Sequence, residues 1–436
     1  MPGSEAAAPG PAAARGGRVG IFVRPRGDDP DRLRNWLGTQ REALSFGTLE
    51  GISIFLPVLL TRLGATELQM GLLGALPNLA ILLLAIPLGG FLQRRRNAVP
   101  WYANGRMLGH LSLAASGLAV LLLPQGMVIP AVLAIVGIAA IFHAFADLAF
   151  WAVMDGVAGP GGRFELIGHR FGLKGGANAV TQLSVGQILS RLPFPVGYQL
   201  VLLASAIPVF TGYRESRRLR IPDNPPQPAQ APLAPHRRAA ALFREVSAER
   251  RFLAFTGSHL LFGLGFRMAL PLLPLWYVRE LGISDGFIGV IGTVQALMTM
   301  VGYFSWRRPA RRLPGRWILL PCALVMAAFP FLVSLVHAEV LLLPLVAVYA
   351  IAYSGLDLAV FDELMRSVPR ERTVRFTSLD TGAQNLAGVA GPLLGAALAS
   401  TFGIAAGLEI AAFVGVAGAL LLGAAAIRRA RAAGEP

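Results

Sequence analysis

A few ionisable side chains interrupt the long apolar stretches of this sequence. Glu50 falls within one stretch, and His143 and Asp147 lie one helical turn apart within another, in the segment HAFAD. A charged side chain in an apolar environment is costly, so it usually faces a cavity or a partner. A histidine beside a carboxylate can also transfer protons near neutral pH. These residues could therefore carry protons or contact a cation, or they could form buried pairs that join neighbouring helices.

Arg267 and Asp357 are comparable charges in the second part of the chain. Arg267 could form a buried pair with Glu50, or it could bind the negative group of a small solute. No further metal-ligating residues gather near the His143–Asp147 pair, so neither a metal site nor a cofactor is expected. We expect the path of a solute or a proton to follow five residues: Glu50, His143, Asp147, Arg267 and Asp357.

The composition indicates where these charges lie. Of the 436 residues, 54% are hydrophobic and 14% are charged, and the mean hydropathy is +0.58. Soluble proteins average about 25% charged residues. Apolar runs of about 20 residues, long enough to cross a bilayer, recur along the chain. The sequence therefore predicts an all-α polytopic membrane protein with twelve transmembrane helices, at residues 42–63, 68–92, 101–124, 127–155, 168–190, 193–213, 252–277, 285–306, 317–337, 339–362, 375–399 and 403–426.

Arginines mark the loops between these helices. They gather at both chain ends and in every loop that follows an even-numbered helix, as in the run Arg94–Arg96. Basic residues accumulate on the cytoplasmic side of membrane proteins. We therefore expect an integral protein of a bacterial-type plasma (inner) membrane with both termini in the cytoplasm. The net charge of +15 then reflects orientation in the bilayer, and no nucleic-acid partner is expected.

Lysine and cysteine usage excludes two further features. Lys174, the only lysine, stands in GLKGGAN, which does not fit the phosphate-binding P-loop motif. Binding of a nucleotide is therefore not expected. Cys322 is the only cysteine, so an intrachain disulfide cannot form.

The predicted helices fall into two groups of six. The first group occupies residues 42–213 and the second occupies residues 252–427. Residues 214–251 between them are rich in proline and arginine, which predicts a cytoplasmic linker. Residues 1–41 are expected to form a disordered cytoplasmic tail, and residues 428–436 a second cytoplasmic tail.

The two groups resemble each other in sequence. Residues 56–79 align without a gap with residues 274–297, which places Gly64 on Gly282 and Gly71 on Gly289. In the same order, DLAFWAVMD resembles DLAVFDELM, which places Asp147 on Asp357, and GLKGGANAV resembles SLDTGAQNL. Parallel repeats joined by a cytoplasmic linker are typical of one class of transporter. The glycines of the second and eighth helices are expected to allow close helix packing.

The chain resembles the major facilitator superfamily of secondary transporters over residues 42–426. The loop after the second helix matches that family's G-x-L-x-D-R-x-G-R-R motif at Gly90, Leu92 and Arg95, with Arg94 in place of the acid. The corresponding loop of the second half keeps Gly302 and Arg307. The resemblance implies two six-helix halves whose helices 1, 4, 7 and 10 line a cavity. It also implies that helix 3 is peripheral, so that Arg106 and His110 contact structure or lipid headgroups rather than solute.

The same resemblance places a gate at the cytoplasmic ends of the helices. Helices 5 and 11 flank the cleft between halves, and polar side chains line one face of each. We expect Arg95 to pair with Asp155, and Arg94 with Asp380, when the cavity faces outward. The predicted gating residues are Gly90, Arg94, Arg95, Asp155, Lys174, Asn178, Arg307, Asp362 and Asp380.

These features favour a monomeric secondary transporter that works by alternating access in the lipid bilayer. Aromatic side chains on the expected cavity helices suit a small lipophilic or amphipathic solute and proton-coupled export. One alternative is an importer of a small organic anion that uses Arg267. Another is a membrane receptor or scaffold that does not transport. An enzyme is not expected, because no nucleophile–base pair or metal-ligating set is present in the sequence.

Overall fold

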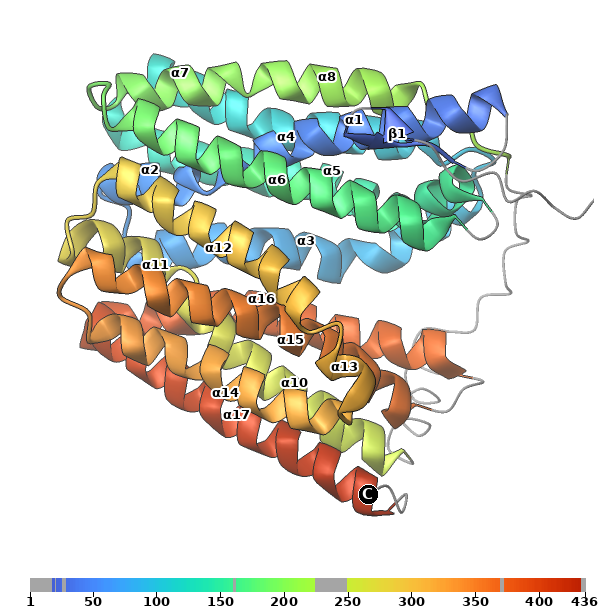
Figure 1. The fold of residues 1–436 in the computed structure, drawn as a ribbon. Coiled ribbons are helices and arrows are strands. Elements are labelled where there is room, and N and C mark those ends of the chain that lie inside the picture. The colour runs from blue at the N-terminus through green and yellow to red at the C-terminus, as the bar shows by residue number, and fades with distance from the viewer. Residues whose placement is uncertain are drawn as a thin grey trace, which may run out of the picture.

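The structure, a computed structural model, describes residues 18–19, 21–25, 29–159, 162–223, 249–368 and 372–432. Apart from one short hairpin, β1 (Arg18–Val19) and β2 (Phe22–Val23), the regular elements of these residues are helices. Figure 1 shows two bundles that lie one above the other, the first coloured blue to green and the second yellow to red. The predicted all-α fold with two helical halves is confirmed.

The first half runs from α1 to α8. Its helices are α1 (Pro30–Ser53), α2 (Phe55–Arg62), α3 (Glu67–Gln93), α4 (Val99–Leu122), α5 (Gln125–Ala158), α6 (Arg163–Leu189), α7 (Val196–Ala204) and α8 (Ala206–Arg217). The predicted first and sixth spans are each divided, because the helices break at Ile54 and at Ser205.

The second half runs from α10 to α17. Its elements are α10 (Arg250–Ala269), α11 (Leu272–Leu275), the π-helix η1 (Trp276–Glu280), α12 (Asp285–Ser305), α13 (Pro309–Arg312), α14 (Gly315–Ser334), the 3-10 helix η2 (Glu339–Leu341), α15 (Leu342–Ser367), α16 (Thr373–Phe402) and α17 (Ile404–Ala432). Three of them, α10, α11 and η1, together form the predicted seventh span.

Each of the twelve predicted spans has a helical counterpart. Eleven of the described helical segments are long and apolar enough to cross a membrane. The twelfth, α6, is helical as expected but is not among the eleven, because Lys174, Asn178 and Gln182 place a polar stripe along it. Such a helix is stable in a bilayer only when that stripe faces protein or a cavity.

The prediction of a disordered tail up to residue 41 is wrong from Pro30 onward. The carboxylate of Asp29 caps α1 by accepting a bond from the amide of Asp31, at 3.0 Å. Trp36 is buried, and its Nε1 donates to the carbonyl of Val157 on α5, at 3.1 Å. Hydropathy does not detect this segment, because charged residues surround the single tryptophan that anchors it.

The other predicted boundaries lie close to the ends of the helices. The linker was expected from residue 214, but α8 continues to Arg217 and α10 begins at Arg250. The expected second tail is helical to Ala432. Residues 1–17, 224–248 and 433–436, which include most of the predicted tail and linker, lie outside the described residues.

The repeat is visible where each half begins its second long helix. Gly64 and Gly282 adopt left-handed backbone angles, with φ of +88° and +62°, which favour glycine. In each turn a hydroxyl two residues later caps the following helix, Thr66 for α3 and Ser284 for α12. Two equivalent turn sequences therefore form equivalent turns.

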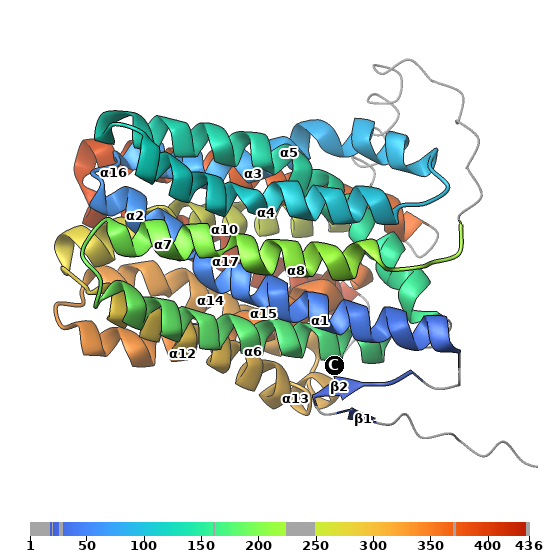
Figure 2. The same ribbon diagram turned by 90° about the horizontal axis from the view of Figure 1, so that it is seen from above.

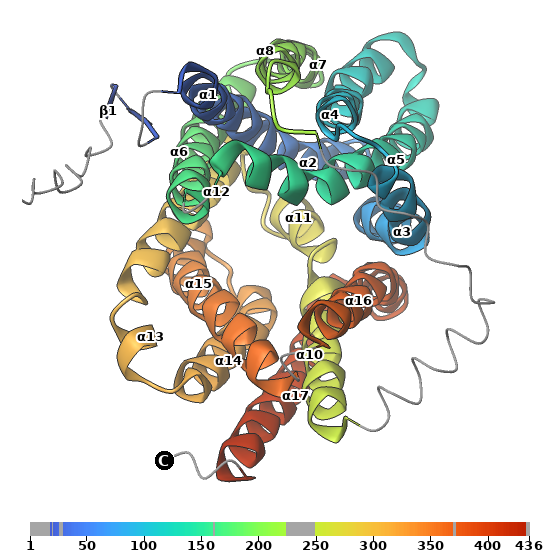
Figure 3. The ribbon, with the colours of Figure 1, turned by 90° about the vertical axis from the view of Figure 1, so that its right-hand side faces the viewer.

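Two helix pairs join the halves, α3 with α16 and α6 with α12. Small residues bring both pairs together, as predicted. A Cβ on Gly186 would lie 2.9 Å from the Cα of Gly289, and one on Gly71 would lie 2.7 Å from the Cβ of Ala396. Figure 3, viewed along the bundles, shows α6 beside α12 and α3 beside α16 at the boundary. Larger residues at these places would separate the halves.

A buried carboxylate holds the first half together. Glu42 of α1 is fully buried and accepts bonds of 2.6 Å from the hydroxyls of Tyr102 on α4 and Ser216 on α8. Arg170 of α6, also buried, donates to it at 3.4 Å. Figure 2 shows these four helices next to one another. The charge of Glu42 and the charge of Arg170 therefore neutralise each other inside the bundle.

Replacing Glu42 with glutamine should destabilise the protein, because it leaves the buried Arg170 guanidinium without a negative partner. Breaking a buried ion pair in this way costs about 3–5 kcal/mol. Thermal unfolding of the purified variant in detergent measures the effect. Glu50→Gln is the matched control, because the Glu50 side chain is 47% exposed and its loss should cost much less.

Adding Arg170→Met to the Glu42→Gln variant should recover part of the lost stability, because no uncompensated charge then remains. Equal melting temperatures for the wild type and Glu42→Gln would contradict this account of the buried pair.

Candidate functional site

A cavity of about 600 Å³ lies within the first half, between α1, α4, α5 and α6. Its wall combines aromatic and apolar side chains with an unusual number of ionisable ones. The ionisable residues that line it are Glu50, Arg106, His110, His143, Asp147, Arg170 and Lys174. The cavity thus contains three of the five residues predicted for a solute or proton path, namely Glu50, His143 and Asp147.

Glu50 of α1 forms an ion pair with the neighbouring helix α6 at the cavity wall. Its Oε1 lies 3.0 Å from Nζ of Lys174, and its Oε2 accepts a 3.5 Å bond from the amide of Asn178. Gln182 continues the polar stripe by donating to Asn178 at 2.5 Å. The suggested pairing of Glu50 with Arg267 is therefore not formed in this conformation, since Glu50 pairs with Lys174 instead.

The two cavity histidines face each other. The rings of His110 on α4 and His143 on α5 meet edge to face, with centroids 4.6 Å apart. Asp147, one turn from His143, is exposed at the cavity wall. Within the described part of the chain, Asp147 has no hydrogen bond or ion pair. His143 and Asp147 therefore share the cavity without bonding to each other.

Arg106 also lies at the cavity wall, one turn from His110 on α4. Its guanidinium carbon is 4.2 Å from the centroid of the Phe46 ring, 5.1 Å from that of Tyr102 and 5.5 Å from that of Phe150. Arg106 and His110 were expected to contact structure or lipid headgroups more than solute, because the third helix is peripheral in the resembled family. In the structure both side chains line the cavity, and Arg106 contacts aromatic rings of the protein.

The remaining predicted path residues lie in the second half and bond to their own half. Arg267 on α10 donates from Nη1 to Oε1 of Gln384 on α16, at 2.9 Å. Asp357 on α15 accepts a 2.8 Å bond from the hydroxyl of Tyr303 on α12. Neither residue lines the cavity of the first half. The structure therefore divides the predicted path between the two halves.

The predicted gating charges also contact their own halves. Asp155 forms an ion pair with Arg163, and Asp362 pairs with Arg366 at 2.9 Å. Asp380 lies 3.2 Å from Nδ1 of His259. In this conformation the expected pairs Arg95–Asp155 and Arg94–Asp380 are not formed. These pairs were predicted for a cavity that faces outward, so they stay predictions for that state.

Three further predicted gating residues, Gly90, Arg95 and Arg307, lie at the arginine-rich end of the bundles. The Arg95 guanidinium stacks over the rings of Phe91, at 4.3 Å, and Trp101, at 5.4 Å. A Cβ on Gly90 would meet no atom within 4 Å. Arg307 follows the end of α12 and is exposed. Arg95, the middle residue of the arginine run after α3, is thus held by neighbouring aromatic rings of the first half.

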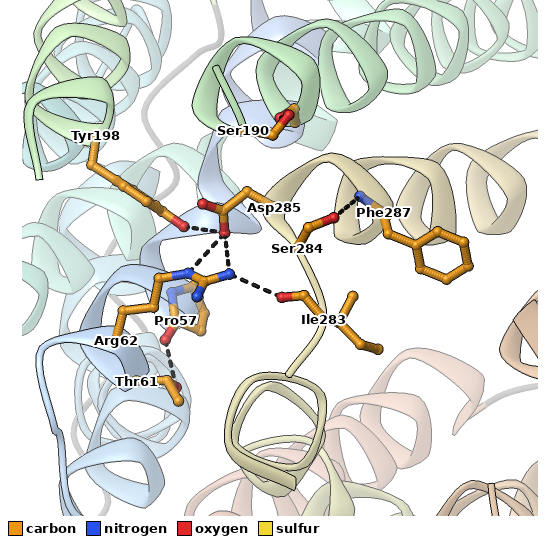
Figure 4. A network of polar contacts seen from close by, with 10 residues as sticks. Pro57, Thr61, Arg62, Ser190, Tyr198, Ile283, Ser284, Asp285 and Phe287 are labelled. Atoms are coloured by element: carbon orange, nitrogen blue, oxygen red, sulfur yellow. Dashed lines mark hydrogen bonds and ion pairs between the residues drawn. The ribbon is translucent and has the colours of Figure 1, made fainter. Parts of the chain in front are cut away.

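The halves are tied together at the opposite end, where the second helix of each half begins. Figure 4 shows Arg62 donating to Asp285 at 2.9 Å and to the carbonyl of Ile283 at 2.9 Å. The hydroxyl of Tyr198 donates to the same carboxylate, at 2.7 Å. Nearby, Arg279 pairs with Glu67 at 2.8 Å. Two crossed ion pairs therefore close this end.

Sequence reasoning missed these closing residues, although the repeat held a signal for them. The alignment of residues 56–79 with residues 274–297 places Glu67 on Asp285, and each acid opens the first turn of its helix. An acidic side chain is favoured there by the helix dipole. Each acid also meets an arginine from the other half, Arg279 for Glu67 and Arg62 for Asp285.

Comparison with known proteins supports this architecture. Residues 255–436 match the family model described as the Major Facilitator Superfamily. No match was found among curated proteins.

Many solved structures share the fold at low sequence identity. A bacterial homologue of the iron transporter ferroportin, in an inward-facing state, has a TM-score of 0.65 at 15% identity and covers 92% of this chain and 98% of its own. A bacterial homologue of the human lysosomal transporter Spinster, inward-facing and unoccupied, has a TM-score of 0.62 at 17% identity, with coverage of 92% and 97%. The xylose transporter XylE from E. coli, in an inward-open conformation, has a TM-score of 0.62 at 16% identity, with coverage of 89% and 94%.

The two-half helical fold runs from α1 to α17 in the described residues, and the family match covers most of the second half. The second half therefore matches the Major Facilitator Superfamily, and the described residues as a whole share the fold of these solved transporters.

Proposed function

We propose that this protein is a proton-coupled exporter that moves a small amphipathic solute through the plasma membrane by alternating access. The observation that carries the proposal is the cavity of the first half, where aromatic walls surround the Glu50–Lys174 ion pair. A cavity of about 600 Å³ falls within the range of small-molecule sites. The protein would work as a monomer, since one chain supplies both halves.

Alternating access is supported by the uneven distribution of contacts between the halves. In the described residues, the hydrogen bonds and ion pairs that join the halves lie at the closed end, around Arg62 and Arg279, or along α6 and α12. At the other end, Asp155, Asp362 and Asp380 bond within their own halves. If the arginine-rich end is cytoplasmic, this conformation faces inward. The outward-facing state would exchange the closing contacts for the predicted pairs Arg95–Asp155 and Arg94–Asp380.

Proton coupling is supported by the position of Glu50. Its carboxylate is half-exposed to the cavity and is held by Lys174 and Asn178. Both lie on α6, the helix of the first half that packs against α12 of the second half. Protonation of Glu50 would break its attraction to Lys174 and release α6 from α1. A proton would thus change how the first half packs at the moment when the solute is exchanged.

Export is proposed because the aromatic lining suits solutes that partition into the membrane. An importer that binds an organic anion through Arg267 has less support, since that guanidinium already bonds Gln384. A scaffold that does not transport is the alternative from another class. Flux of a panel of aromatic acids, amines and amides in proteoliposomes separates it from a transporter, because a scaffold would move none of them.

Replacing Asp285 with asparagine should open the closed end, because Arg62 loses its negative partner. The measurement is labelling of a cysteine placed at Ser190, beside α12, with a membrane-impermeant maleimide in a Cys322→Ala background. We expect the labelling rate to rise several-fold. Asp362→Asn is the control, because its partner Arg366 lies in the same half at the other end.

Exchanging the two charges, with Arg62→Asp and Asp285→Arg together, should return the labelling rate towards that of the parent protein. Unchanged labelling in Asp285→Asn would contradict the role of this pair as the closing contact.

Replacing Glu50 with glutamine should abolish transport driven by a proton gradient while leaving solute exchange at equal pH measurable. The reason is that glutamine keeps the size of the side chain but cannot bind and release a proton. Proteoliposomes loaded with the best solute of the panel measure both activities. The exposed Glu339→Gln is the control and should retain both. Gradient-driven accumulation by Glu50→Gln at the wild-type level would remove Glu50 from the coupling mechanism.

A further inference from the structure

We propose that the transported solute carries an anionic group and that Arg106 binds it, while the aromatic wall of the cavity holds an apolar or aromatic body. The anionic group would be a carboxylate, sulfonate or phosphate. This inference rests on the proposed function, because it names the class of solute that the same cavity would carry.

The side chain of Arg106 is surrounded by aromatic rings and has no polar partner among the described residues. Its guanidinium is encircled by the rings of Phe46, Tyr102 and Phe150, at 4.2–5.5 Å from their centroids. Among the residues that the structure describes, no carboxylate, amide or hydroxyl bonds this guanidinium, and its Nε is buried without a partner. Cation–π contacts replace only part of the hydration that the guanidinium loses inside the bundle. A guanidinium inside a membrane therefore still favours an anion strongly.

Two other cations of the cavity wall, Arg170 and Lys174, are already paired with carboxylates. Arg170 is neutralised by Glu42, and Lys174 by Glu50. Among the described residues, Arg106 is thus the cation of this wall that has no carboxylate partner. A guanidinium can bind a carboxylate or a phosphate through two parallel N–H bonds, which fixes orientation as well as adding affinity.

Asp147 is an acidic residue of the same cavity wall that could neutralise Arg106 but does not bond to it. Asp147 lines the same cavity from α5, and within the described residues it bonds neither Arg106 nor any other group. The two opposite charges do not bond, although α4 and α5 pack closely at Gly105, where a Cβ would lie 2.7 Å from the carbonyl oxygen of Phe142. The cavity therefore keeps Arg106 available instead of closing it in an internal ion pair.

The remainder of the wall fits the other part of such a solute. Phe46, Phe150, Trp151 and Phe171 supply flat apolar surfaces around Arg106 and Lys174. Such rings can stack on an aromatic solute or meet it edge to face, which adds to the gain from burying apolar surface. A neutral lipophilic solute would use these walls but leave the guanidinium without a partner, so the wall as a whole favours an aromatic anion.

The test is binding of matched compounds to the purified protein, measured by isothermal titration calorimetry. The probes are 2-naphthoate and its neutral analogue 2-naphthamide, and naphthalene-2-sulfonate and its neutral sulfonamide. The wild type should bind at least one anion about tenfold more tightly than its neutral analogue, because a hydrogen-bonded charge is worth at least that factor. Arg106→Gln should reduce this preference to less than about twofold.

Two further variants keep the test decisive. Arg106→Lys keeps the charge and should fold where the glutamine variant does not. It should weaken binding of the anion several-fold without changing binding of the amide, since an ammonium cannot form two parallel bonds. The exposed Arg191→Gln is the control for a general loss of positive charge and should bind as the wild type does.

The inference is overturned if the wild type shows no preference for the anion of either pair. It is also overturned if Arg106→Gln keeps the preference, or if Arg267→Gln loses it in place of Arg106→Gln. Flux in proteoliposomes separates this failure from failure of the proposed function. Selective binding that depends on Arg106, without flux, would refute transport but keep the anion site. Flux of the anion and of its neutral analogue at equal rates, both unchanged in Arg106→Gln, would refute the anion site but keep transport.

Discussion

The ion pair between Arg62 and Asp285 decides how the two halves of this protein sit against each other. Each residue lies at the end of a helix in a different half, and Tyr198 donates to the same carboxylate, so three helices meet at one charge. With the crossed pair of Arg279 and Glu67, it closes one end of the bundles. Small residues along α3, α6, α12 and α16 then allow the helices to remain in contact while the other end separates.

A second constraint concerns every other charge in the membrane-spanning helices: each must meet a partner or face a cavity. Glu42 and Arg170 meet this requirement by pairing inside the first half, and Glu50 and Lys174 meet it by pairing at the cavity wall. Arg106 satisfies it only in part, through aromatic rings. The same rule that explains the stability of the first half therefore also points to the group that a solute would contact.

The sequence was sufficient to predict the helices, the two halves and the repeat, because these follow from hydropathy, glycine turns and arginine-rich loops that are local in the chain. It also identified Glu50, His143 and Asp147, which the fold brings to one cavity. It did not predict the start of α1, where one buried tryptophan outweighs its charged neighbours. It did not show that Arg106 faces the cavity, since the direction in which a side chain leaves a helix depends on how that helix packs. Asp285 was missed because its partner lies in the other half, far away in sequence.

The central claim is that the two halves move as units about the contact at the closed end. Electron–electron distance measurements between spin labels in liposomes test it most directly, with one pair at Glu165 and Ser305 and another at Leu68 and Phe402. Both pairs join exposed positions on opposite halves, at the open and the closed end respectively. If the halves move as units, two populations are expected. In one, the distance between labels at Glu165 and Ser305 is longer and that between Leu68 and Phe402 is shorter; in the other, the first distance is shorter and the second is longer. Distances that stay fixed, or that change in the same direction at both ends, would contradict it.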